Sequence, residues 1–145
     1  MTASSSSTDA KRQPGRHRAR RNAMMVLYKL DLLPGDVDSA IQEWVREHDF
    51  ELPAYARQLI ETVDADRERI DATLTANLQE WSLERLGAVE RNILRIAMCE
   101  LLGDDVPHEV AIDEAIELAK RYASPEAAKL VNGVLGGYVR GRGTS

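Results

Sequence analysis

Residues 110–136 read VAIDEAIELAKRYASPEAAKLVNGVLG, and their pattern is the clearest indication of the fold class. Its apolar residues recur at intervals of three and four, which is the repeat of an amphipathic helix and not of a strand. Ser124 and Pro125 divide the stretch, because serine is a favoured helix N-cap and proline a favoured first helical residue. The stretch therefore predicts two consecutive helices, one over residues 109–123 and a final one from Pro125 onwards.

The same spacing of apolar residues continues towards the N-terminus, interrupted by Pro, Gly and Asp. Five further helices are predicted: over residues 16–33, 37–47 and 53–63, after Asp64 or Asp66, and over residues 83–102. The helix over 83–102 is apolar around much of its circumference, so it should be central and nearly surrounded. The sequence predicts an all-α fold, a compact bundle of about seven helices without strands.

Composition divides the chain into one domain and two tails. Residues 1–15 are polar and serine-rich and should form a disordered arm, because they have almost nothing to bury. Residues 16–140 hold every predicted helix, which is about the length of one domain. Residues 141–145 follow as a short tail, which we expect to be disordered because this end of the chain is glycine-rich.

The net charge of −5 conceals an uneven distribution. Residues 10–30 contain seven basic residues and no acidic one, and the rest of the chain contains 12 basic and 24 acidic residues. A basic segment on an acidic body indicates a polyanion that is held at one place and repelled elsewhere.

No enzyme motif is present in the sequence. The histidines His17, His48 and His108 are far apart, and with the single Cys99 they form no zinc-binding spacing. Cys99 lies in an apolar helical stretch and is interpreted as a small core residue. We therefore expect no catalytic residues, no metal and no cofactor. No apolar run reaches the roughly 18 residues of a membrane span, so we expect a cytoplasmic protein without membrane contact.

The arginine-rich run is the candidate nucleic-acid site. Arg16, Arg18, Arg20 and Arg21 lie where the polar arm meets the first helix. Arginine side chains there can bind phosphates bidentately, and the helix N-terminus adds free backbone N–H donors. The alternative is that the run is a solvated tail without a ligand.

Three stretches resemble the NusB family: GRHRARRNAMMVLYKLDL from Gly15, LERLGAVERNILRIAMCELL from Leu83, and VAIDEAIELAKRYASPEAAKLVNGVLG from Val110. The third is the most specific. The resemblance covers residues 16–136 and implies a seven-helix fold. It also implies a role in transcription antitermination, in which the protein pairs with the ribosomal protein NusE. The pair would then bind boxA RNA of ribosomal RNA operons, in a complex with RNA polymerase.

The resemblance also implies roles for single residues. The family's RNA-contacting arm corresponds to Arg16, His17, Arg18 and Arg20, and its RNA-proximal surface to Glu126 and Lys129. Tyr28 and Glu90 correspond to positions of the NusE interface. Other interpretations stay open: Tyr28 as a half-buried core aromatic, Glu90 as a solvated partner of an arginine, and Lys129 as the partner of Glu126 one helical turn away.

The chain departs from the family pattern beside Lys129. Leu130 stands where many members carry an aromatic residue, and Ala128 where they carry a polar one. A stacked aromatic contributes about 1–3 kcal/mol per base, so RNA binding would lose this contribution or obtain it from another residue. Two other roles remain: a homodimeric structural helical domain, and an accessory RNA-binding domain of an RNA methyltransferase system.

Overall fold

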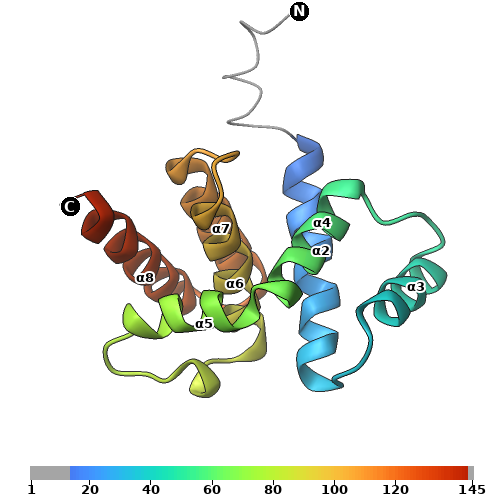
Figure 1. Cartoon of the computed structure of the whole chain (residues 1–145), viewed down its shortest axis with the longest axis horizontal. Coiled ribbons are helices and arrows are strands. Elements are labelled where there is room, and N and C mark those ends of the chain that lie inside the picture. Colours follow the sequence, from blue (N-terminus) through green and yellow to red (C-terminus); the bar gives the residue numbers. More distant parts are fainter. Residues whose placement is uncertain (1–13, 144–145) are drawn as a thin grey trace, which may run out of the picture.

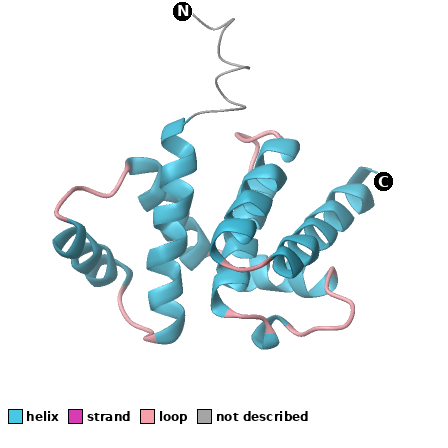
Figure 2. Ribbon diagram, turned by 180° about the vertical axis from the view of Figure 1, so that it is seen from behind, coloured by secondary structure: helices cyan, strands magenta, loops and turns pink. Residues whose placement is uncertain are grey.

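The protein consists of α-helices joined by short loops (Figure 1). The computed structural model describes residues 14–143. Its seven α-helices and one short 3₁₀ helix are, in chain order, α2 (Pro14–Leu32), α3 (Val37–His48), α4 (Ala54–Ala65), α5 (Arg67–Ala76), η2 (Leu83–Arg85), α6 (Ala88–Leu102), α7 (His108–Tyr122) and α8 (Pro125–Gly143). Between residues 14 and 143 there is no strand (Figure 2). The predicted all-α fold with seven helices is confirmed.

Local hydrogen bonds fix several helix ends. The Asp36 carboxylate accepts a hydrogen bond from the backbone N–H of Ser39 at 2.9 Å and so caps α3. Asp49 ends that helix with φ at 58°, a left-handed conformation that aspartate tolerates better than most residues. The hydroxyl of Ser124 accepts from the backbone N–H of Ala127 at 3.0 Å, so the N-cap predicted for the last helix is confirmed.

Helix α6 lies at the centre of the molecule, as its apolar sequence predicts. It packs against α2, α4, α5, α7 and α8. Figure 1 shows α2, α3 and α4 towards one end of the molecule and α8 towards the other, with α6 and α7 between them. One hydrophobic core runs through both sides, and its fully buried side chains include Ile60, Leu74, Leu94, Met98 and Leu135. Burial of this apolar surface on both sides of α6 therefore supports one folded unit.

The helix predicted over residues 83–102 is divided in two. Residues Leu83–Arg85 form η2, the chain is extended at Leu86 and Gly87, and α6 begins at Ala88. The Arg91 guanidinium stabilises the break because its Nη1 donates hydrogen bonds to the carbonyl oxygens of Leu83, Glu84 and Leu86, the last at 2.7 Å. Apolar periodicity continues across the break, so the pattern alone could not show it.

The helical region extends beyond the predicted boundaries at both ends. Pro14 and Gly15 belong to α2, in agreement with the preference of proline for the first turn of a helix. Residues 141–143 belong to α8, whose Arg142 donates a hydrogen bond to the Leu101 carbonyl at 3.4 Å. The remainder of the expected arm and tail, residues 1–13 and 144–145, lies outside the described residues.

Candidate RNA and partner interface

The basic residues at the start of α2 point to two different sides. Helical spacing places Arg16 and Arg20 on the inward side and Arg18 and Arg21 on the outward side. Arg20 is buried, with its side chain 4% exposed, and its Nε donates to Glu100 Oε2 at 2.8 Å. The guanidinium is enclosed in the core and already paired, which speaks against the expected contact of Arg20 with RNA.

Arg16 and His17 also have partners within the protein. Arg16 Nη2 lies 2.8 Å from Asp105 Oδ2, and its guanidinium stacks 4.1 Å above the centre of the Tyr55 ring. His17 Nδ1 lies 2.5 Å from Glu114 Oε1. Both residues are at the surface or near it, so a phosphate could reach them only in competition with these carboxylates.

Glu100 is the buried centre of this charge network. Its carboxylate accepts hydrogen bonds from Arg20 and from the Tyr55 hydroxyl, the latter at 2.5 Å. Burial raises the pKa of Glu100 above its usual value, in opposition to the Arg20 charge. Burial and the neighbouring Glu100 also raise the pKa of Tyr55. The network fastens the start of α2 to α4 and α6, which is a structural role.

The outward side of α2 is one continuous stripe. It consists of Arg18, Arg21, Met25, Tyr28 and Leu32, spaced three or four residues apart, and we call it the α2 stripe. Arg18 is exposed and has no ion-pair partner in the described part of the chain, while the Arg21 guanidinium donates to Asn22 Oδ1. The stripe is thus basic at its N-terminal end and apolar at its C-terminal end.

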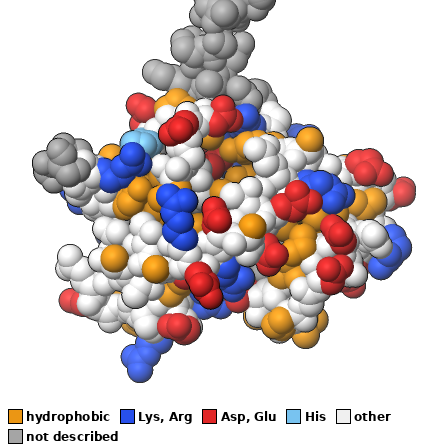
Figure 3. All heavy atoms as spheres, in the orientation of Figure 1, with side chains coloured by type: hydrophobic (Ala, Val, Ile, Leu, Met, Phe, Trp, Pro, Cys, Tyr) orange, Lys and Arg blue, Asp and Glu red, His pale blue; other side chains and the backbone are white. Residues whose placement is uncertain are grey.

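The apolar end of the stripe is exposed to solvent. Tyr28 is 37% exposed and Leu32 55% exposed, and Leu33 beyond them is 78% exposed. Figure 3 shows hydrophobic side chains gathered where α2 ends. At 37% exposure, Tyr28 fits the alternative of a half-buried aromatic as well as that of an interface residue. Apolar residues gathered at the surface in this way are typical of a protein-binding surface.

Glu90 and Glu126, which are far apart in the sequence, line one groove of about 330 Å³ between α6 and α8. Trp81 and Leu130 line the same groove. Among the described residues, neither Glu90 nor Lys129 has an ion-pair partner, so neither predicted surface pair, Glu90 with an arginine or Lys129 with Glu126, is present. The fold therefore joins a residue expected at the partner interface with one expected near RNA.

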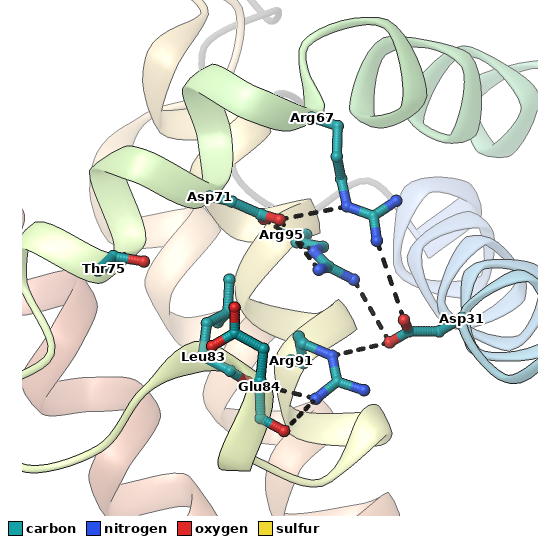
Figure 4. A pocket seen from close by; sticks show the side chains of 8 residues that line it. All are labelled: Asp31, Arg67, Asp71, Thr75, Leu83, Glu84, Arg91 and Arg95. Atoms are coloured by element: carbon teal, nitrogen blue, oxygen red, sulfur yellow. Dashed lines mark hydrogen bonds and ion pairs between the residues drawn. The ribbon is translucent and has the colours of Figure 1, made fainter.

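A second charge cluster was not predicted from the sequence. It lines a hollow of about 390 Å³ between α2, α5 and α6 (Figure 4). Asp31 Oδ2 lies 2.8 Å from Arg91 Nε and 3.4 Å from Arg95 Nη1, and Asp71 binds Arg95 through two hydrogen bonds of 2.9 and 3.0 Å. The sequence feature that could have predicted this cluster is Asp31 in the last turn of α2, because the helix dipole disfavours negative charge there unless a cation compensates it.

The described residues contain no group of three or more His, Cys, Asp or Glu side chains that could hold a metal ion. Cys99 is only partly buried, although it packs against the core as expected. No described helix is long and apolar enough to cross a membrane.

Comparison with known proteins gives a consistent result. The NusB family profile matches residues 17–140. The transcription antitermination protein NusB of Exiguobacterium sp. strain AT1b is 44% identical over 126 residues, which cover 86% of this chain and 97% of that protein. NusB of Rubrobacter xylanophilus is 42% identical over 123 residues, which cover 84% of this chain and 88% of that protein.

Solved structures agree with the sequence matches. NusB of T. maritima superposes with a TM-score of 0.77 and 36% identity, over 86% of this chain and 90% of that one. A chain from a crystal structure of the antitermination factors NusB and NusE with double-stranded RNA gives a TM-score of 0.79 and 34% identity, over 90% of this chain and 99% of that one. The profile, the relatives and the fold together show that this chain belongs to the NusB family of transcription antitermination proteins.

Proposed function

We propose that this chain is a non-enzymatic adaptor of transcription antitermination in the cytoplasm. It holds a boxA-type RNA element of ribosomal RNA operon transcripts and the ribosomal protein NusE on adjoining surfaces, for an antitermination complex with RNA polymerase. The observation that carries the proposal is the α2 stripe, which is basic at one end and apolar at the other. The two ends, Arg18 and Leu32, are separated by roughly 21 Å along the helix.

The RNA side of the proposal rests on exposed cations. Arg18 and Arg21 on α2 and Lys129 on α8 carry charges that no described carboxylate neutralises. Arg16 and His17 can join them only if phosphate displaces Asp105 and Glu114. Arg20 takes no part, because it is buried. We therefore expect about three phosphate contacts from the described residues.

The partner side rests on Tyr28, Leu32 and Glu90. The first two are exposed on α2, and Glu90 lies at the start of α6 without an ion-pair partner among the described residues, in a groove that Arg85 also lines. The exposed apolar residues of α2 fit a protein partner with apolar side chains, and a carboxylate such as Glu90 fits a basic residue on that partner. NusE is the partner we propose for it.

Three groups have a raised pKa, and the one carboxylate among them is paired within the protein. Burial is the main cause for Tyr55, Cys99 and Glu100, and the Glu100 carboxylate is fully engaged by Arg20 and Tyr55. The Glu100 carboxylate is thus part of the structural network that holds α2 on α6.

The proposal is tested by measuring boxA RNA binding over a salt series, with and without NusE. Three phosphate contacts predict a slope of log K against log salt of about −2, since each contact to single-stranded RNA contributes about −0.7. Arg18→Ala with Arg21→Ala should flatten the slope by about 1.4. NusE should increase the RNA affinity, because each partner holds the other in place.

The matched control is Arg46→Ala with Arg69→Ala, which removes two exposed arginines from α3 and α5. This variant should retain the slope of the unmodified chain. If both double variants lost the same amount of salt slope, the effect would be one of net charge and not of the α2 arginines. An RNA affinity that NusE does not alter would contradict the adaptor role.

A further inference from the structure

A groove of about 370 Å³ lies between α8 and the loop that follows α5. The groove is lined by the loop residues Asn77, Leu78, Gln79, Glu80 and Trp81 and by Leu130, Gly133 and Val134 of α8. Trp81 and Leu130 also line the neighbouring groove that reaches Glu90 and Glu126. Trp81 therefore stands where the two grooves meet, in the groove that Glu90 and Glu126 also line.

Trp81 is a large aromatic residue of which about half is exposed. Its side chain is 53% exposed, whereas the other tryptophan, Trp44, is buried and stacks on His48. No described aromatic ring stacks on Trp81; the ring pairs present join Trp44, His48 and Phe50. An exposed indole face in a groove is a surface on which a flat group can stack.

The opposite wall is open because residue 133 is a glycine. Glycine in the interior of a helix is unfavourable relative to alanine. Gly133 has no positive φ, and a Cβ placed on it would meet no atom within 4 Å. Neither the backbone conformation nor packing against the described residues requires glycine here. The missing side chain instead keeps the groove open towards the backbone of α8.

The edge of the groove carries amides. The Asn77 side chain donates from Nδ2 to the Thr73 carbonyl at 2.9 Å, which fixes its orientation and leaves Oδ1 as an acceptor. Gln79 adds an exposed amide to the lining. Lys129 lies one helical turn before Gly133 on the same face of α8 and is exposed. Stacking surface, amide edge and nearby cation are the three elements that proteins use to bind an unpaired nucleotide.

We propose that the groove between Trp81 and Gly133 is a subsite for one unpaired nucleobase, which stacks on the Trp81 indole while Lys129 meets its phosphate. The inference rests on the proposed RNA-binding function and adds to it a base-recognition site. Trp81 would supply the stacking for which Leu130, on the opposite wall, has no aromatic ring.

The first test is RNA affinity in two variants of Trp81. Trp81→Ala should weaken binding of a boxA-type single-stranded RNA by about five- to 150-fold, the effect of removing one stacked base. Trp81→Phe retains a ring and should restore most of the affinity. Equal losses in both variants, or no loss in either, would overturn the proposal.

The second test separates ligand binding from folding. Gly133→Ala should leave the thermal unfolding midpoint unchanged or raise it, because alanine favours the helix, yet weaken RNA binding by at least about fivefold. Gly141→Ala is the matched control, since it lies in the same helix outside the groove and a Cβ there also meets nothing within 4 Å. Unaltered RNA affinity in Gly133→Ala would contradict a base in the groove.

Tryptophan fluorescence reports the stacked base directly. RNA should quench the emission of Trp81, and Trp81→Phe, which leaves only the buried Trp44, should abolish the quenching. An RNA series with an abasic site at each position in turn should identify one position at which quenching is lost. Uniform quenching across the series would contradict a single-base site.

The outcomes for the two proposals are distinguishable. Loss of RNA binding in the Arg18 and Arg21 double variant, without an effect in Trp81→Ala or Gly133→Ala, would leave the adaptor role intact and reject the subsite. Weaker NusE binding with unchanged RNA affinity in Trp81→Ala would assign the groove to a protein partner and also reject it.

Discussion

Arg20 and Glu100 form an ion pair in the interior, with Nε 2.8 Å from Oε2 and the two side chains 4% and 2% exposed. A charge of the arginine-rich run is thereby used to fasten α2 to α6. Burial of a charge is tolerated here because its partner and hydrogen bonds are in place.

Arg20→Ala should lower the free energy of unfolding by about 3–5 kcal/mol, because Glu100 is left buried without its cation. Urea unfolding measures the loss. A double-mutant cycle of Arg20 and Glu100 should give a larger coupling energy than one of Arg16 and Asp105, a surface pair of the kind that contributes about 0–1 kcal/mol. If folded Arg20→Ala lost RNA affinity as Arg18→Ala does, the assignment of Arg20 to the core alone would be refuted.

Asp31 should make the free energy of unfolding depend on pH in the acidic range. Burial by itself raises the pKa of this carboxyl, but hydrogen bonds from Arg91 and Asn92 outweigh it and hold the pKa below its usual value of 3.8. The folded state thus binds a proton less readily than the unfolded state, so stabilisation by Asp31 is complete above the unfolded pKa and is lost as pH falls through the lower folded value. The Asp31→Asn variant should have a lower free energy of unfolding at pH 7. This free energy should also fall less steeply than that of the unmodified chain as the pH is lowered. If the unfolding free energies of Asp31→Asn and of the unmodified chain, measured with urea from pH 7 to pH 2, fell in parallel, this role of Asp31 would be contradicted.

Arg91 should hold the loop between η2 and α6 in place. Its Nη1 donates to three backbone carbonyls, and lysine cannot reproduce this planar arrangement. Arg91→Lys should therefore speed amide hydrogen exchange over residues 83–88 and weaken NusE binding through the neighbouring Glu90. Arg69→Lys is the control, because Arg69 is exposed on α5 and has no ion-pair partner among the described residues. Unchanged exchange in Arg91→Lys would show that the loop is held by packing alone.

Ser124 should stabilise the start of α8. Its hydroxyl caps the helix by accepting from the Ala127 N–H, and loss of such a cap costs about 0.5–2 kcal/mol. Ser124→Ala should lower the unfolding free energy by that amount, whereas Ser124→Asp, which retains an acceptor, should not. Equal destabilisation in both variants would point to a steric role instead of the cap.

Local interactions explain how far the sequence could predict this structure. Caps and turn residues act within one helical turn, so the Asp36 and Ser124 helix starts follow from the chain itself. The apolar repeat likewise indicated that α6 would be central. The repeat could not reveal the break at Gly87, because the carbonyls freed there are satisfied by Arg91, which becomes available only once α6 is formed.

The sequence alone determined the helices, the basic start of α2 and the resemblance to the NusB family, since each depends on residue type and spacing along the chain. The tertiary structure alone decided that Arg20 is a core residue while Arg18 is a surface one, because Glu100 approaches α2 from one side only. It also brought Trp81 opposite Gly133 in one groove, which the separation of the two residues along the chain could not predict. Burial and pairing depend on which helices pack together, and packing is a property of the whole chain.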